Sequence, residues 1–344
     1  MIGTEFITGQ GLGNQLFVYV TSRCLALDKG CKFGTASQEK FAMNVHNDRG
    51  MYFMDIDLGE KITEEMKKDY KIYNEKEVRL HIGNSIHDME LGCYVTGVDE
   101  DLSKVEDNTI VYGNLQDESY FIHHIDEVKE WLKVLPEYDS YEYSSDDLCI
   151  INVRGGEYSG RPELFVSRRY YLNAIKKMKE INPNMRFMIV TDDEQAANRI
   201  LPNIEAHHFD MGKDYVTIKN AHYLIMSNTS FAILPTHTSD TLKYAIAPKY
   251  WARHNVSDGY WASEQNIYSL YHYMDKKGQL YTPEECRREL QEYKKRSRKF
   301  KKDLEKATGL KKLKQLSYHK FLMIRFWIGR IGLSLRKRLG VVKY

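Results

Sequence analysis

The middle of the chain alternates between short apolar runs and amphipathic segments, and this alternation limits the possible folds more than any other feature. LCIINVRG (148–155) and RFMIVTDD (186–193) are apolar runs bounded by polar turns, as expected of buried strands. The segments 166–181 and 194–202 repeat their apolar residues at helical spacing. Consecutive β-α-β units imply a parallel sheet with crossover helices.

The same pattern continues after this unit, where 205–211 predicts a strand and 214–226 predicts a helix that runs into the turn SNTS. Beyond Trp251 the apolar pattern fades. From Cys286 to Leu316, apolar residues recur every three or four positions among Lys and Arg, which predicts a basic amphipathic helix.

The start of the chain has its own strand, glycine turn and helix. IGTEFIT (2–8) is β-branched, GQGLGNQ (9–15) is a turn sequence, and 16–30 has a helical pattern that ends at Gly30. A further strand begins near 109, and 120–135 predicts a helix. Typical domain sizes then divide the chain into α/β domains at 1–145 and 146–286 and a basic tail at 287–344.

The near-neutral total charge hides an uneven distribution. Residues 287–344 contain 20 Lys/Arg and four Asp/Glu, a net charge of +16, whereas residues 1–286 carry −14. A basic tail of this kind favours an anionic surface, and lipid headgroups suit it better than nucleic acid because the body is acidic. Arg325, Arg330 and Lys320 fall on different sides of the helix predicted for 320–338, so we expect neither a clean apolar stripe nor a membrane span.

The cysteines and the first residues indicate the compartment. Five cysteines are scattered without a CxxC or metal-ligand spacing, which argues against disulfides and a zinc site. The first 17 residues lack the basic and apolar regions of a secretory signal. We therefore expect a cytoplasmic protein on the inner face of the plasma membrane, bound peripherally through residues 287–344.

Several polar motifs follow predicted strands, where ligands of parallel sheets bind. INVRGGEY (151–158) places Arg154 at the end of a buried strand, and a guanidinium suits two oxygens of a diphosphate. TDDE (191–194) and SNTSF (227–231) end other elements of the same sheet. We interpret the three as one site. The alternatives are an ion pair of Arg154 with Glu157 or Asp192, Asp192 as a helix N-cap, and a purely structural glycine turn at 9–13.

Metal ligands are the other use for paired acids. Asp192 and Asp193, or Asp55 and Asp57 in MDID, would then act as in transferases that hold a cation with Asp-x-Asp. Neither pair accompanies a nucleotide motif, so we expect no metal and no cofactor, with the charge of a leaving diphosphate stabilised by arginine instead.

Six motifs in order, GxGNQxFxY, YGNLQDESYF, NVRGGEY, TDDE, SNTSF and APKYW, resemble those of the α-1,2-fucosyltransferases of glycosyltransferase family 11. The resemblance covers residues 5 to 255. It implies a GT-B-like pair of Rossmann-type domains with parallel sheets, GDP-fucose as donor and inversion at the anomeric carbon. The family's HxRRGDY falls on Asn152–Tyr158, so Arg154 matches the diphosphate arginine, whereas Asn152, Gly155 and Glu157 depart from the pattern.

The predicted function is transfer of fucose to a hydroxyl of a galactoside, including a lipid-linked glycan, in surface polysaccharide or O-antigen assembly. We assign Arg154 and Glu157 as catalytic, with Glu157 as the candidate base by its motif position and Glu163, His123 and His124 as the alternatives for that role. His123, Tyr158 and Glu163 are candidates for acceptor binding. The predicted donor-binding residues are Gly11, Gly13, Asn14, Gln15, Asn152, Arg154, Asp192, Ser227, Asn228, Thr229 and Ser230.

Two other functions remain open on this reasoning. One is a transferase of the same fold that uses another nucleotide sugar. The other is an inactive, membrane-associated subunit of a polysaccharide-assembly complex, which the altered 152–158 motif would fit.

Overall fold

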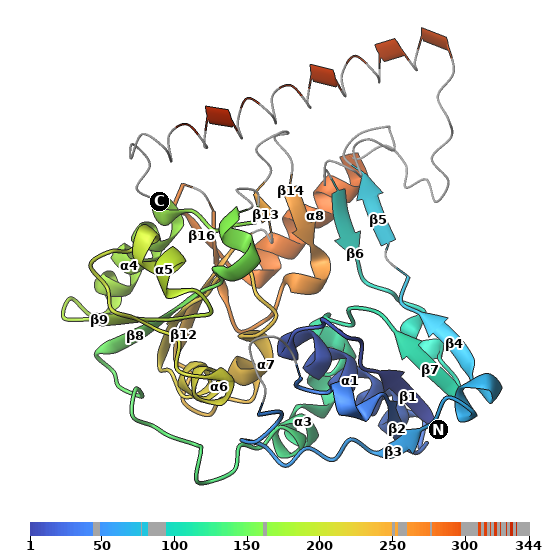
Figure 1. Ribbon diagram of the computed structural model, residues 1–344. Coiled ribbons are helices and arrows are strands. Elements are labelled where there is room, and N and C mark those ends of the chain that lie inside the picture. Colours follow the sequence, from blue (N-terminus) through green and yellow to red (C-terminus); the bar gives the residue numbers. More distant parts are fainter. Residues whose placement is uncertain are drawn as a thin grey trace.

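A computed structural model gives the fold of the chain (Figure 1). It describes residues 1–43, 49–76, 78–81, 94–160, 164–249, 252–253, 260–275 and 277–296, together with twelve helical positions between 309 and 335.

The N-terminal half is built on a parallel sheet with strand order β3-β2-β1-β7-β4. Its strands are β1 (Ile2–Glu5), β2 (Phe33–Ala36), β3 (Glu60–Ile62), β4 (Lys71–Asn74) and β7 (Thr109–Tyr112). Helix α1 (Leu12–Asp28) connects β1 to β2 as predicted, but it begins within the predicted turn 9–15 and ends two residues before Gly30. Helix α3 (Ile125–Trp131) is shorter than the predicted 120–135, because 3-10 turns occupy the residues before it.

The second half carries a larger sheet with order β10-β9-β8-β11-β12-β15-β16, parallel except for the last pair. Its strands are β8 (Leu148–Val153), β9 (Arg186–Thr191), β10 (Ala206–His207), β11 (Tyr223–Ile225), β12 (Tyr244–Pro248), β15 (His272–Met274) and β16 (Leu280–Tyr281). Its helices are α4 (Arg168–Ile181), α5 (Glu194–Ile200), α6 (Met211–Lys219) and α7 (Ile233–His237). The two parallel α/β sheets confirm the predicted fold class.

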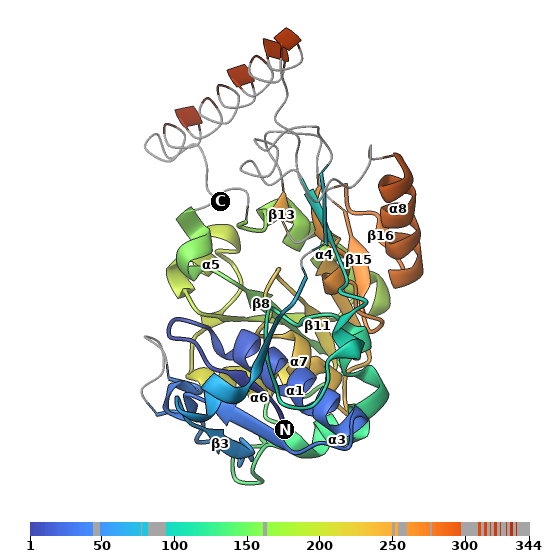
Figure 2. The same cartoon turned by 90° about the vertical axis from the view of Figure 1, so that its right-hand side faces the viewer.

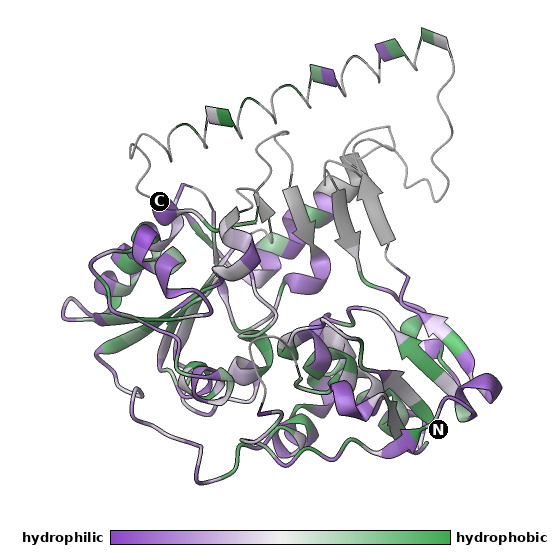
Figure 3. Cartoon of the chain, viewed as in Figure 1, coloured by the Kyte–Doolittle hydropathy of each residue, from purple (hydrophilic) through white to green (hydrophobic). Residues whose placement is uncertain are grey.

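Alternating residues of β8 face two different cores, as the period of two in a strand requires. Ile150 packs in the core that also holds α1, α6 and α7, whereas Cys149 and Ile151 pack in a second core with α4 and α5. The first core is continuous across both halves of the chain, and Phe17 of α1 stacks on Tyr268 with ring centroids 6.4 Å apart. Figure 3 shows hydrophobic residues along the strands and hydrophilic residues on the outer helix surfaces.

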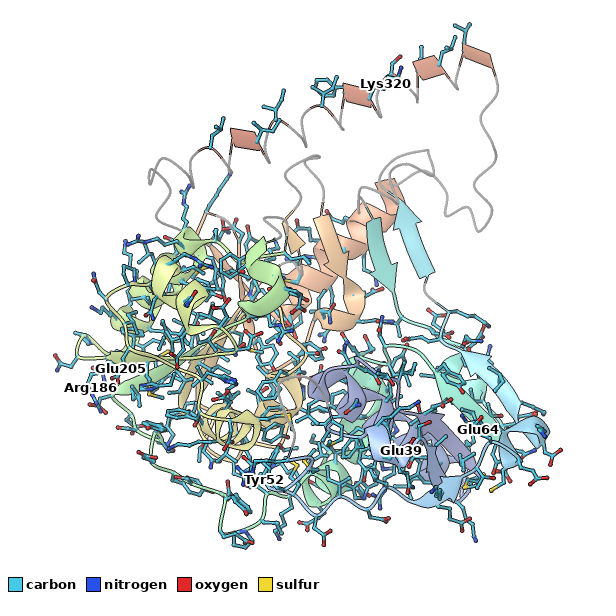
Figure 4. The ribbon with its side chains drawn as sticks, in the orientation of Figure 1. Glu39, Tyr52, Glu64, Arg186, Glu205 and Lys320 are labelled. Atoms are coloured by element: carbon cyan, nitrogen blue, oxygen red, sulfur yellow. The ribbon has the colours of Figure 1, made fainter. Side chains whose placement is uncertain are left out.

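A smaller sheet joins the halves. Its strands are β5 (Val78–His81), β6 (Tyr94–Gly97), β13 (Ala252–Arg253) and β14 (Tyr260–Ser263), and β14 pairs with β6 in parallel. Tyr52, labelled in Figure 4, also donates a hydrogen bond to Asp210 at the start of α6. Figure 2, turned from the view of Figure 1, shows α8 (Pro283–Arg296) at the side of the molecule, next to β15 and β16. Residues 1–145 and 146–286 therefore share one sheet and one core.

Two sequence predictions differ from this structure. The predicted helix 214–226 is α6 followed by strand β11: α6 is capped by Asp210 and ends at Lys219, and Tyr223–Ile225 pair with both β8 and β12. The apolar pattern also persists after Trp251, since Tyr268, Tyr271 and Tyr273 are fully buried.

Helix α8 (Pro283–Arg296) crosses the predicted boundary at 286. Cys286 and Leu290 are buried in the first core, so the start of this helix belongs to the second half rather than to the tail. Within the described part of the chain, no helix has the length and apolar content needed to cross a membrane.

Short 3-10 helices complete the described elements, at Gln38–Lys40, Met66–Asp69, Leu102–Lys104, Glu118–Tyr120, Ile122–His124, Gly156–Gly160 and Glu264–Asn266. Four of the five cysteines are free thiols, and Cys93 lies outside the described residues.

Candidate functional site

The strand order of each sheet reverses at one point, and ligands of such sheets bind beyond the carboxyl ends of the strands there. In the second sheet the chain runs from β8 to β9 and β10, then returns to β11 on the other side of β8. Arg154 follows β8, and Ser227–Ser230 follow β11. In the first sheet the corresponding neighbours are β1 and β7, followed by the glycine turn and by Gly113–Gln116.

Arg154 is held between two carboxylates. Its Nη2 donates to both oxygens of Glu157 at 2.9 Å, and its Nη1 lies 2.6 Å from Oδ2 of Asp192. Burial alone would lower the pKa of Arg154, but Asp192 and Glu157 outweigh burial and raise this pKa. The guanidinium is therefore a permanent positive charge at the end of β8, with Tyr158 beside it at 5.6 Å from the ring centroid.

The backbone of Arg154 is tied to the neighbouring strand end. Its N–H donates to Oγ of Ser227 at 3.2 Å, and this hydroxyl donates to Oδ1 of Asn152 at 3.0 Å. Asn152 and Ser227 are buried. NVRGGEY and SNTSF are thus brought together as predicted, and the buried amide and hydroxyl fix the direction in which Arg154 leaves the sheet.

The two aspartates of the TDDE segment, Asp192 and Asp193, have different roles. Asp193 caps α5 by accepting from the N–H of Ala196 at 2.9 Å. Asp192 accepts from the N–H of Gly155 at 2.7 Å and pairs with Arg154. Gly155 is required here, because a Cβ at this position would lie 2.5 Å from Cβ of Asp193.

The glycine turn lies against the SNTS turn of the other half. A Cβ on Gly13 would lie 2.5 Å from the carbonyl carbon of Ser230 and 2.6 Å from the nitrogen of Phe231, so α1 approaches this backbone at a distance that glycine alone permits. Gly11, the N-cap of α1, is exposed and has no such neighbour. The first turn of α1 therefore borders the same site as Ser230.

Asn14 and Gln15 have different surroundings. Gln116 donates to Asn14 at 2.9 Å and accepts from Asn266 at 3.2 Å, which links both halves beside the site. Gln15 is buried and bonds the backbone of Lys40 and Ala42, which gives it a structural role in the loop after β2.

The acceptor candidates do not gather in one place. Tyr158 lies beside Arg154. His123 contacts Asp28 at the last residue of α1, about 22 Å along the helix from Gly13 at 1.5 Å per residue. Glu163 lies outside the described residues.

A pocket opens beside the site at the carboxyl ends of β11 and β12. Ser227, Asn228 and Thr229 line one side. Lys249 and Glu289 line another and form an ion pair. We did not assign Lys249 from the sequence, although it lies in the APKYW motif. Asn266 and Glu289 carry no sequence signal that could have marked them.

No family model matches the chain, and no curated protein matches it in sequence. Among solved structures, NodZ α-1,6-fucosyltransferase with GDP is 12% identical, over 72% of this chain and 94% of that chain, with a TM-score of 0.42. NodZ from Bradyrhizobium is 14% identical over 72% and 94%, with a TM-score of 0.41. POFUT1 with GDP is 9% identical over 71% and 97%, with a TM-score of 0.36. Because all three TM-scores are below 0.5, we argue function from this chain's own residues.

Proposed function

We propose that the protein is an inverting, metal-independent glycosyltransferase that moves fucose from GDP-fucose to a hydroxyl of a galactoside in surface polysaccharide assembly. One observation carries the proposal: a permanently charged guanidinium stands at the switch point of a parallel sheet, next to a turn of hydroxyl and amide side chains. This is a suitable place for a nucleoside diphosphate. The choice of fucose and guanosine rests on the motif resemblance.

The reaction breaks the bond between the anomeric carbon and the β-phosphate oxygen, and GDP leaves with that oxygen's electron pair. Arg154 stabilises the negative charge that develops on this oxygen, and Ser227–Ser230 hold the diphosphate. The acceptor oxygen attacks the opposite face of the sugar and gives its proton to a base. Glu157 is three residues from Arg154 and exposed, so it can reach a water-facing acceptor.

Arg154→Ala tests this role. One charge-assisted contact to developing charge contributes about 3–4 kcal/mol, so we expect transfer to fall at least a hundredfold. Stability should fall by about 1–3 kcal/mol, because the Asp192 oxygen that pairs with Arg154 is buried and would lose its partner, whereas Glu157 is exposed. Lysine should rescue poorly, since it lacks the planar fork of donors.

Arg186→Ala is the matched control. Arg186, labelled in Figure 4, also makes two hydrogen bonds to one carboxylate, that of Asp147. It does so at the amino ends of β8 and β9, away from the site. The control should keep full activity. Arg154→Ala with activity within tenfold of wild type would contradict the assignment.

The donor is tested by thermal protection. GDP should raise the unfolding midpoint and UDP should not, and the Arg154→Ala variant should lose most of the GDP effect. Protection by UDP instead would favour another nucleotide sugar. GDP protection without any hydrolysis or transfer of GDP-fucose would favour the inactive subunit.

We further propose that residues 287–344 bind the enzyme to an anionic lipid surface that carries its acceptor. The described apolar residues of the tail include Leu310, Phe321, Ile324, Ile328 and Leu335, and all are more than half exposed. The net charge of +16 favours anionic headgroups over neutral ones.

Vesicle sedimentation tests this binding. Because Cys286 and Leu290 are core residues, the deletion should begin after Arg296 rather than at 287. The shortened enzyme should transfer to a soluble acceptor and no longer sediment with anionic vesicles. Ile324→Asp with Ile328→Asp, which keeps every basic residue, should weaken binding as well. Failure of the full-length protein to sediment with such vesicles at low salt would overturn this part of the proposal.

A further inference from the structure

We propose that Asp28, His123 and His124 form a surface site for a divalent metal ion of the zinc class, separate from the proposed active site. Asp28 ends α1, and the two histidines lie in the 3-10 helix Ile122–His124. Their ligand atoms all lie within 4.8 Å of one another, and the part of the chain that the structure describes holds no other such group of His, Cys, Asp or Glu.

The distances suit a tetrahedral ion. Nε2 of His124 lies 2.8 Å from Oδ1 of Asp28, and Nε2 of His123 lies 3.2 Å from Oδ2 of Asp28. Zinc bonds of about 2.0–2.1 Å in a tetrahedron place neighbouring ligand atoms roughly 3.3 Å apart. Small side-chain movements would therefore admit the ion. Asp28 and His123 are exposed, so water can occupy the fourth position.

A second carboxylate lies near one of the rings. Nδ1 of His124 is 3.7 Å from Oε1 of Glu127, so a small side-chain movement would bring the two atoms within hydrogen-bond distance. A histidine that binds metal through one nitrogen commonly donates from the other to a carboxylate, which fixes its tautomer and makes it a stronger ligand. Glu127 is placed for this role, and Nε2 of His124 then points its lone pair toward the ion.

The other histidine–carboxylate pairs of the described chain lack these features. Asp146 meets one histidine, His222, and the same carboxylate oxygen also meets the ammonium of Lys243, which would repel a cation. Asp214 meets His208 alone. Among the residues that the structure describes, Asp28 alone pairs with two imidazoles, and none of their lysines or arginines pairs with this carboxylate. Imidazole and carboxylate ligands favour zinc, copper or nickel over magnesium.

Titration of the metal-free, full-length protein with zinc chloride tests the site. We expect one ion per chain at this site. Asp28→Asn and His124→Ala should each weaken zinc binding by more than a hundredfold, because each removes a direct ligand. Glu127→Gln should weaken it by about 10- to 100-fold, as loss of an outer carboxylate does. The matched control, His222→Ala, should bind zinc like wild type.

The thermal unfolding midpoint, measured with and without zinc, distinguishes loss of the metal site from misfolding of a variant. Zinc should raise the unfolding midpoint of wild type, because the folded chain alone brings α1 and the 3-10 helix together. It should not raise that of Asp28→Asn, whose midpoint without metal should match wild type within a few degrees. Wild type that fails to bind zinc, or Asp28→Asn and His124→Ala variants that bind zinc as wild type does, would overturn the proposal.

Discussion

Gly13→Ala examines how the two halves meet at the site. The added Cβ would lie 2.5–2.7 Å from three main-chain atoms of Ser230 and Phe231, about 1 Å closer than ordinary carbon contacts. Main-chain atoms cannot rotate aside, so α1 must move away from the turn. Overpacking of this kind costs about 1–3 kcal/mol, whereas alanine in a helix returns up to about 1 kcal/mol relative to glycine. We expect a net loss of about 1–2 kcal/mol of unfolding free energy.

Denaturant unfolding measures this loss, and GDP titration measures its effect on the site. Gly11→Ala is the matched control, because a Cβ there meets nothing within 4 Å and the residue is exposed. The control should lose less, up to about 1 kcal/mol, because Gly11 is the N-cap of α1 and alanine caps a helix less well than glycine. GDP binding should weaken in Gly13→Ala, since the turn that we propose holds the diphosphate is displaced. A Gly13→Ala protein at least as stable as wild type would show that the halves do not pack as described.

Three further predictions concern charge. Glu157→Gln should bind GDP more tightly, because Arg154 loses a competing carboxylate, while transfer falls about 10²- to 10⁴-fold for want of a base; unchanged transfer would assign the base elsewhere. Transfer should persist in excess EDTA, and recovery by manganese after a complete loss would show that the reaction needs a cation. Burial alone would raise the pKa of Glu118, but hydrogen bonds from His237 and Ser269 outweigh it and hold the pKa below 4.5. Ionised Glu118 therefore stabilises the folded state above about pH 4.5, and this stabilisation is lost as the pH falls through the folded-state pKa. The unfolding midpoint of wild type should thus drop more steeply on acidification than that of Glu118→Gln.

Local patterns predicted the parallel sheets well, because strands buried on both faces are apolar throughout and stand out against amphipathic helices. LCIINV and RFMIVT are the clearest cases, and both are central strands. Strand β11 was missed because it has three residues and follows α6 without a proline or glycine between them. The pairing of β6 with β14 could not be predicted from local patterns either, because the paired residues are more than 160 positions apart in the sequence.

The sequence predicted those residues of the candidate site that directly follow a strand. Arg154, Asp192 and Ser227 each follow a strand, and parallel strands bring such residues to one edge. Lys249, Asn266 and Glu289 border the same region, yet their placement depends on how β12, a 3-10 helix and α8 pack in three dimensions. The contact of Gly13 with Ser230 likewise depends on the packing of the halves, which no local pattern records.

The pairing of Arg154 with Glu157 suggests how donor binding and proton transfer would be coupled in the proposed reaction. Without a ligand, both carboxylate oxygens of Glu157 accept hydrogen bonds from the Arg154 guanidinium. A carboxylate in such an ion pair is a weak base. An arriving diphosphate carries more negative charge than Glu157 and competes for the same N–H groups. Once displaced, Glu157 regains its basicity a short distance from the sugar. Proton abstraction from the acceptor would then begin only when the donor is in place.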